Sequence, residues 1–172
     1  MEMWDIYDGN RQKTNLKVER DAVFSKDMFR ITVHICIFNS KGEMLIQQRS
    51  ASKKNFPNVW DITLGGNVQA GETSQQAAER ELNEELFIKH DFGGERPYLT
   101  VNFDNGFDDY YILKEDIDIK KIKFFDNEVQ AVRWAGLDEI LQLIKKGMFI
   151  NYYPSFITAL FEMKKHRGVF NI

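Results

Sequence analysis

The chain has 172 residues, of which 43% are hydrophobic, and its formal net charge is −3 at pH 7. This composition can build a packed core, so disorder of the whole chain is excluded, and the acidic balance disfavours a protein that mainly binds nucleic acid. The single cysteine excludes an intramolecular disulfide, and no apolar run approaches the roughly 20 residues that cross a bilayer. We therefore expect one cytoplasmic domain, residues 1–172, with neither a membrane nor a nucleic acid as partner.

Strand and helix signals alternate along the chain. In chain order we predict a strand at 4–7, a hairpin of 29–38 and 43–48, a basic loop at 50–58, a strand at 59–64 that ends at Gly65-Gly66, a helix at 73–86, a hairpin of 98–103 and 110–114, a strand at 129–134, and helices at 137–146 and 155–166. Thr73 and Gln76 have the spacing of a capping box, and Pro154 suits the start of the last helix. This order predicts an α/β (α+β) fold in which helices pack on a mixed sheet.

Three glutamates share one face of the helix at 73–86. At about 100° per residue, Glu81, Glu84 and Glu85 fall within an arc of about 100°, beside an apolar stripe. Like charges at this spacing repel, so the face is either simply solvated or a site for a divalent cation. The glycine pair Gly65-Gly66 would let a substrate approach the start of this helix closely.

The same segment carries a family resemblance. Residues 66–88, GNVQAGETSQQAAERELNEELFI, resemble the Nudix box Gly-x5-Glu-x7-Arg-Glu-U-x-Glu-Glu-x-Gly-U, where U is a bulky aliphatic residue. Eight of the nine defined positions match, namely Gly66, Glu72, Arg80, Glu81, Leu82, Glu84, Glu85 and Ile88. Phe87 replaces the second glycine, and a phenylalanine pays a steric penalty in the left-handed conformation that this glycine adopts. The resemblance implies a Nudix-type α/β/α sandwich.

The resemblance also implies a role for the charged residues of the box. Glu81, Glu84 and Glu85 would hold Mg²⁺ or Mn²⁺, while Glu72 would pair with Arg80 and brace the loop against the helix. In this family, water attacks one phosphorus of a diphosphate while the metal ions withdraw charge from the phosphoryl oxygens.

The proton of the attacking water needs a base. Glu84 or Glu85 could accept it, and many members of the family place the base on a distant loop instead. Glu128, just before the predicted strand 129–134, is our candidate for that second arrangement. A surface acid at the start of a strand is the alternative interpretation of Glu128.

A second segment narrows the resemblance to one branch. Residues 48–60, QRSASKKNFPNVW, are similar to isopentenyl-diphosphate isomerases and to uncharacterised hydrolases related to them. In those isomerases an arginine and a lysine spaced as Arg49 and Lys53 bind the substrate diphosphate. A planar guanidinium and a compact ammonium both suit phosphate, although a solvated basic loop would have the same composition.

Isomerase chemistry, however, needs residues that this chain lacks. The isomerases carry Cys-Gly-His where this chain has Gly65-Gly66-Asn67, and a further metal-binding histidine falls at Arg30. Cys36 lies in the middle of a predicted strand, so we expect a buried thiol there. Both departures favour hydrolysis over isomerisation.

The resemblance therefore implies a metal-dependent hydrolase that cleaves a diphosphate linkage in a small metabolite. A nucleoside diphosphate derivative is the substrate that the family favours. An isomerase-like enzyme and a non-catalytic nucleotide-binding module are the alternatives, and modules of that kind usually lose box glutamates. The aromatic residues 149–161 cover the core, line the pocket or form a homodimer contact, and the sequence does not rank these three.

Overall fold

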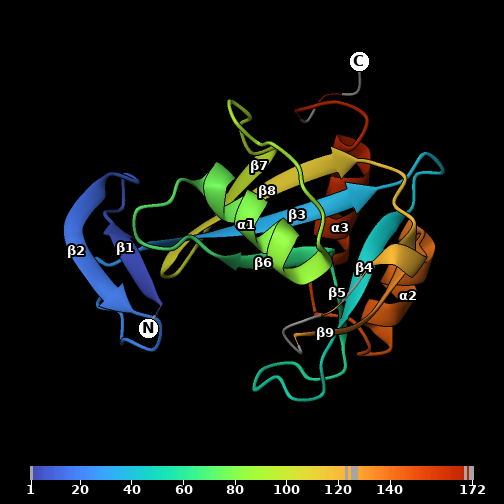
Figure 1. Ribbon diagram of the computed structural model, residues 1–172, viewed down its shortest axis with the longest axis horizontal. Coiled ribbons are helices and arrows are strands. Elements are labelled where there is room, and N and C mark those ends of the chain that lie inside the picture. Colours follow the sequence, from blue (N-terminus) through green and yellow to red (C-terminus); the bar gives the residue numbers. More distant parts are fainter. Residues whose placement is uncertain (1, 123, 125–127, 169, 171–172) are drawn as a thin grey trace.

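The computed structural model describes residues 2–122, 124, 128–168 and 170 (Figure 1). Its elements are β1 (Met3–Tyr7), β2 (Lys13–Glu19), β3 (Arg30–Phe38), β4 (Met44–Arg49), β5 (Trp60–Asp61), β6 (Leu64–Asn67), α1 (Ser74–Leu86), β7 (Leu99–Phe103), β8 (Gly106–Lys114), the 3-10 helix η1 (Ile119–Lys121), β9 (Val129–Ala135), α2 (Leu137–Lys145) and α3 (Pro154–Met163). Within the described ranges, none of the helices is long and apolar enough to span a membrane.

The main sheet is mixed and is built around β3. This strand runs parallel to β8 and antiparallel to β6, and β8 pairs with β7 on its other side. Strand β4 pairs with β5 and β9 and meets β3 at the single pair Phe38↔Met44. A parallel pair needs a long crossover between its strands, and the chain between β3 and β8 supplies one that includes α1. The predicted mixed sheet with helices is confirmed.

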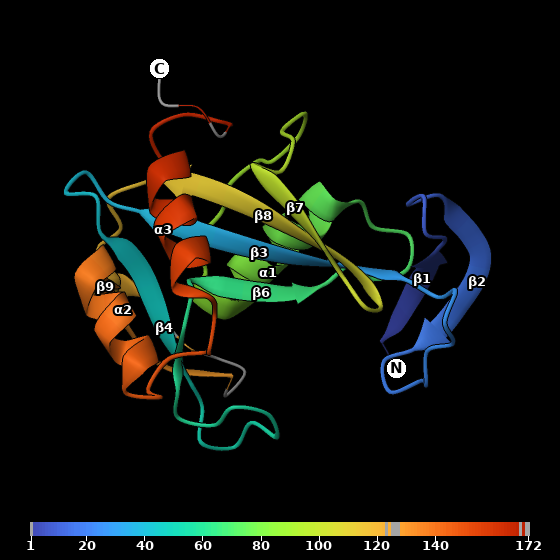
Figure 2. The same cartoon turned by 180° about the vertical axis from the view of Figure 1, so that it is seen from behind.

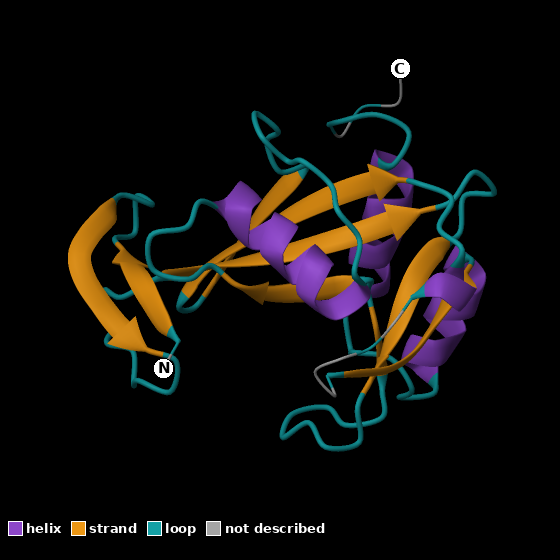
Figure 3. Ribbon diagram, in the orientation of Figure 1, coloured by secondary structure: helices purple, strands orange, loops and turns teal. Residues whose placement is uncertain are grey.

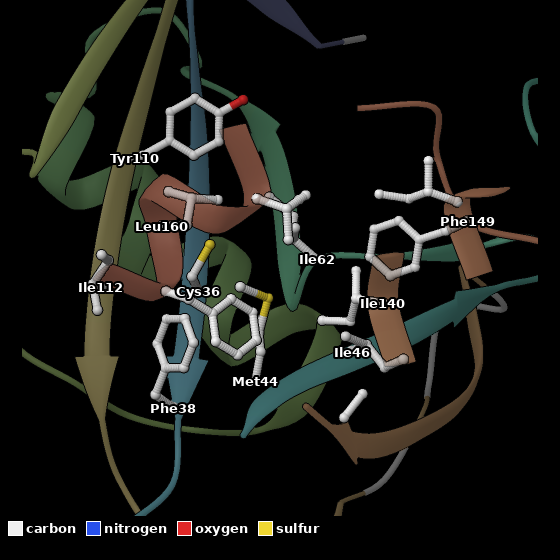
Figure 4. Close-up of a cluster of buried hydrophobic side chains, with 14 of the residues drawn as sticks. Cys36, Phe38, Met44, Ile46, Ile62, Tyr110, Ile112, Ile140, Phe149 and Leu160 are labelled. Carbon is white, nitrogen blue, oxygen red and sulfur yellow. The ribbon is translucent and has the colours of Figure 1, made fainter. Parts of the chain in front are cut away.

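Helices cover both faces of this sheet. Helix α1 lies on one face and α3 on the other, as Figure 2 and Figure 3 show. Alternate residues of β3 point to opposite faces, so Ile35 and Ile37 pack on the side of α1, whereas Cys36 and Phe38 pack on the side of α3. Figure 4 shows Cys36 near Leu160 of α3. The buried thiol predicted for Cys36 is therefore confirmed, and burial raises its pKa.

Several predicted boundaries are wrong. The strand predicted at 59–64 splits into β5 and β6, and β6 continues through the glycine pair to Asn67 because it pairs with β3. The hairpin of 29–38 and 43–48 forms but opens after one residue pair, since β4 turns away to join β9. Strand β8 begins at Gly106 rather than at residue 110, and α3 ends at Met163 rather than at residue 166. Strand β2 was not predicted, because its residues are mostly exposed and carry few apolar side chains.

Both ends of α1 follow local rules. The Thr73 hydroxyl accepts the Gln76 amide at 3.2 Å, and the Gln76 side chain accepts the Thr73 amide at 2.9 Å, so the predicted capping box is present. At the other end Phe87 adopts φ 57°, and its amide and that of Ile88 bond to the carbonyls of Asn83 and Leu82. Phe87 thus takes the left-handed conformation of the glycine that it replaces, with its side chain 57% exposed.

Strands β1 and β2 form a separate antiparallel ribbon at one end of the molecule (Figure 1). We call residues 2–20 the N-terminal ribbon. At the end of the ribbon away from the turn, the Arg20 amide donates a hydrogen bond to the Glu2 carbonyl. Tyr7 and Phe29 exchange backbone hydrogen bonds of 2.8 and 3.1 Å and join the ribbon to the chain just before β3. The ribbon is therefore attached to the body but outside its main sheet.

Candidate active site

Arg80 is the hub of the predicted box. Its Nε and Nη2 donate to the two Glu72 oxygens at 2.7 and 3.0 Å, which forms the Glu72–Arg80 pair expected from the sequence. Its Nη1 donates to Glu81 at 2.7 Å and to Glu84 at 3.1 Å, and Nη2 also donates to the Asn67 carbonyl at 3.0 Å. One guanidinium therefore ties the loop before α1 to two glutamates of the helix.

The pKa values of two partners of Arg80, Glu72 and Glu81, shift in opposite directions. Burial alone would raise the pKa of Glu72, but hydrogen bonds from Arg80 and from the Gln69 amide outweigh burial and lower it. Burial raises the pKa of Glu81; Arg80 opposes this rise, and the negative charges of Glu84 and Glu128 add to it. Arg80, together with the Gln69 amide, thus outweighs burial at Glu72, whereas burial outweighs Arg80 at Glu81.

Gly66 leaves the space that Glu81 occupies. A Cβ built on Gly66 would lie 2.0 Å from Oε1 of Glu81, far inside any contact distance. A Cβ on Gly65 would lie 2.7 Å from Nδ1 of His34 and 3.0 Å from the Val33 carbonyl oxygen. A side chain at either glycine would therefore displace a close neighbour, the Glu81 carboxylate at Gly66 and the His34 ring at Gly65.

The three box glutamates have different surroundings. Glu84 is 52% exposed, whereas Glu85 is only 4% exposed and lines a cavity behind the glycine pair. Within the described ranges, no group of three or more histidine, cysteine, aspartate or glutamate side chains is gathered closely enough to hold a metal ion. The predicted ligands lie on one helix, but the guanidinium of Arg80 forms ion pairs with both Glu81 and Glu84. These carboxylates are therefore not arranged around a common metal position.

Two adjoining hollows bring the predicted residues together. One, of about 170 Å³, reaches Glu85, and the other, of about 270 Å³, reaches Glu81 and Glu84. Six residues line both hollows, and all but Asn67 were predicted as site residues: Arg49, Lys53, Gly65, Gly66, Asn67 and Glu128. A larger hollow of about 340 Å³ beside Lys164 carries none of these residues.

Two cations at the basic loop contribute to the wall of this site. Lys53 Nζ lies 2.7 Å from Glu128 Oε2, so the predicted phosphate ligand and the candidate base form an ion pair across 75 positions of sequence, 128 − 53. Arg49 donates to the carbonyls of Phe56 and Asn55 at 3.2 and 3.1 Å. Each cation is thus held at the wall of the site.

Sequence reasoning missed Asp61, which lines the smaller hollow. Its Oδ1 accepts the Tyr152 hydroxyl at 3.0 Å, and its Oδ2 lies 3.7 Å from Arg49 Nη1. Burial raises the pKa of Asp61, and the nearby His34, Arg49 and Tyr152 partly oppose this. The only sign of Asp61 in the sequence is that it is a single acid in the apolar run VWDITL. Nothing in the neighbouring residues distinguishes this acid from one in a turn.

The positions that depart from the isomerases lie together. Arg30 Nε donates to the side chain of Asn67 at 3.0 Å, and its guanidinium also lies near the rings of Trp4, Phe24 and Phe103. His34 stacks on Tyr110 with ring centroids 4.6 Å apart and lines the smaller hollow. The two residues that replace the expected histidines thus contact each other.

The chain is similar to known proteins in sequence and in fold. The family model described as NUDIX domain matches residues 28–155. An uncharacterized Nudix hydrolase of Listeria monocytogenes is 38% identical over 164 residues, covering 95% of this chain and 96% of that protein. An isopentenyl-diphosphate Delta-isomerase of Pectobacterium atrosepticum is 28% identical over 169 residues, covering 92% and 86%. The crystal structure of DR0079 from Deinococcus radiodurans has a TM-score of 0.71 at 27% identity, covering 86% of this chain and 91% of that one.

Proposed function

Because the chain belongs to the NUDIX family, we propose that this Nudix hydrolase cleaves the diphosphate linkage of a nucleoside diphosphate derivative. Glu81, Glu84 and Glu85 would hold the Mg²⁺ or Mn²⁺ that such enzymes need. In this proposal residues 1–172 act as one domain.

One observation carries the proposal. The acids of α1 and the cations of the basic loop, Arg49 and Lys53, line the same pair of hollows. Acids alone would suit a cation and cations alone an anion, whereas their combination suits a diphosphate that bridges metal and protein. The glycine pair forms part of the wall of both hollows.

The donor set fits a hard divalent cation. Carboxylate oxygens are the ligands that Mg²⁺ prefers, and the buried Glu85 faces the hollow beside the glycine pair. When bound, the ion would neutralise charge on the phosphoryl oxygens and lower the pKa of a water. A cation there would replace the Arg80 N–H groups as a partner of Glu81 and Glu84.

The residues of the chain supply the remaining steps. Arg49 and Lys53 bind the phosphate that is not attacked and orient the diphosphate. A phosphate bound by Lys53 would compete with Glu128 for the Lys53 ammonium group, and Glu128 is the proposed acceptor of the proton of the attacking water. Glu85 and Glu84 are the other candidates for this base.

The isomerase alternative is not favoured by the site. Gly65 offers no thiol, and Arg30 and Asn67 hydrogen-bond to each other where that chemistry would need metal-binding histidines. The intact set of box glutamates likewise disfavours a non-catalytic module. We therefore propose hydrolysis alone.

The test is product release from a panel of diphosphate compounds, with Mg²⁺, Mn²⁺ or EDTA. The panel contains nucleoside di- and triphosphates, nucleotide sugars, ADP-ribose, dinucleoside polyphosphates and isopentenyl diphosphate. We expect metal-dependent hydrolysis of a nucleoside derivative, with kcat reduced at least ~100-fold in Glu84→Gln. Glu162→Gln, the same change on the exposed face of α3, is the matched control. Equal turnover in Glu84→Gln and wild type, or turnover that EDTA does not affect, would reject the proposal.

A further inference from the structure

The loop that enters α1 is held from outside the family domain. The N-terminal ribbon precedes residues 28–155, which the family model matches. Two bonds nevertheless join it to this loop: the Ala70 amide donates to the Met3 carbonyl at 2.7 Å, and the Gly71 amide donates to Oδ2 of Asp5 at 2.7 Å. The ribbon is thus bonded to the segment that carries the first glutamate of the box.

Asp5 is built into this contact. Its side chain is 2% exposed, and its Oδ2 also forms an ion pair with Lys13 of β2. Gly71 has φ +94°, a conformation that a side chain rarely adopts, and no atom lies within 4 Å of a Cβ built on it. Glycine is therefore required here by the backbone, which aims its N–H at the Asp5 carboxylate.

The loop before α1, which Asp5 contacts at Gly71, is in turn bonded to the glutamates of α1 through Glu72 and Arg80. The Glu72 amide donates to the Gln69 carbonyl at 3.0 Å, and the Gln69 amide donates to the Glu72 carboxylate at 2.9 Å. Glu72 in turn holds Arg80, which contacts Glu81 and Glu84. Asp5 is therefore connected to Glu81 and Glu84, two of the three predicted metal ligands, through the Gly71 amide, the peptide bond between Gly71 and Glu72, and the hydrogen bonds of Arg80.

We propose that Asp5 is a positioning residue of the active site: by holding the Gly71 amide, it fixes the loop that orients Arg80 and the box glutamates. Asp5 is not among the residues that line the two hollows, so its loss lowers kcat and weakens metal binding while KM changes little. The kinetic part of this inference rests on the proposed function, whereas its effects on metal binding and on the Gly71 amide do not.

Three variants separate the contacts of Asp5. Asp5→Ala removes both partners, Asp5→Asn keeps an oxygen for the Gly71 amide but loses the charge, and Lys13→Met removes only the ion pair. We expect at least a tenfold fall in kcat and a tenfold rise in the Mn²⁺ Kd for Asp5→Ala, recovery to within threefold for Asp5→Asn, and wild-type values within threefold for Lys13→Met. Thermal unfolding of each variant establishes that it is folded.

Amide hydrogen exchange provides a readout that does not require turnover. In the wild-type protein, the Ala70 and Gly71 amides should be protected from exchange, and in Asp5→Ala the Gly71 amide should lose protection while amides within α1 keep theirs. An unprotected Gly71 amide in the wild type would overturn the inference even if Asp5→Ala did not fold. Unchanged kcat and Mn²⁺ affinity in folded Asp5→Ala, or Asp5→Asn as impaired as Asp5→Ala, would also overturn it. If no diphosphate is hydrolysed at all, the proposed function fails while exchange and Mn²⁺ binding still decide the role of Asp5.

Discussion

Gly66→Ala is the sharpest test of the site geometry, because a single methyl group meets a proposed metal ligand. The added Cβ would lie 2.0 Å from Glu81 Oε1, and ordinary contacts begin near 3.4 Å, so the two groups must separate by roughly 1.4 Å. The backbone of Gly66 is not in the left-handed region, so alanine meets no backbone strain there. The Glu81 carboxylate, at the end of a flexible side chain, is therefore the group that moves.

A displacement of about 1 Å at a catalytic group costs on the order of 100-fold in rate. We therefore expect Gly66→Ala to lower kcat by about two orders of magnitude. Thermal unfolding of the variant should remain close to that of the wild type. Gly136→Ala is the matched control, since no atom lies within 4 Å of a Cβ built there and Gly136 has φ −77°.

The assay is steady-state hydrolysis of the best substrate of the panel, together with the Mn²⁺ Kd and the Tm. Full activity in Gly66→Ala would show that the position of the Glu81 carboxylate does not matter to the reaction. A Tm that falls in proportion to the activity would instead assign the loss to folding. Either result would refute the argument that Gly66 is kept for the space that Glu81 needs.

Three further predictions follow from individual contacts. Lys53→Ala should raise KM at least fivefold with little change in kcat, because Lys53 is proposed to bind a non-reacting phosphate; an unchanged KM would leave only its ion pair with Glu128. Phe87→Gly should increase the free energy of unfolding by about 1 kcal/mol in urea titrations, since φ 57° costs phenylalanine but not glycine, and equal or lower stability would show that the side chain repays its strain. The wild type should lose stability as the pH falls through and below about 4.5, because the folded-state pKa of Glu72 lies below its ordinary value and its contribution disappears on protonation. Glu72→Gln should flatten this acid limb, and an unchanged pH dependence would contradict the assignment.

The organisation around Arg80 suggests why the box contains an arginine. Three carboxylates of like charge lie within reach of one guanidinium, which is planar, always charged and able to donate to several acceptors at once. A lysine would present one compact charge and could not span Glu72 and Glu81 in the same geometry. The arginine therefore acts as a rigid connector between the loop and the helix.

The sequence by itself was sufficient for features that depend on local spacing. The box between Gly66 and Ile88, the capping box at Thr73 and the common face of the glutamates all follow from positions a few residues apart, because helical periodicity and capping are local. The Glu72–Arg80 pair was also expected, from the resemblance rather than from the spacing. The family and the mixed α/β fold followed from these features.

Only the tertiary structure decided the contacts between distant segments. The pairing of Lys53 with Glu128, the inclusion of Asp61 in the wall of the site and the bond from Asp5 to Gly71 join residues that have no common periodicity. The continuation of β6 through its glycines likewise depends on β3, whose backbone closes against them. Such contacts arise when the sheet register and the closure of loops bring separate segments together. The local conformational preference of neither partner predicts that they will meet.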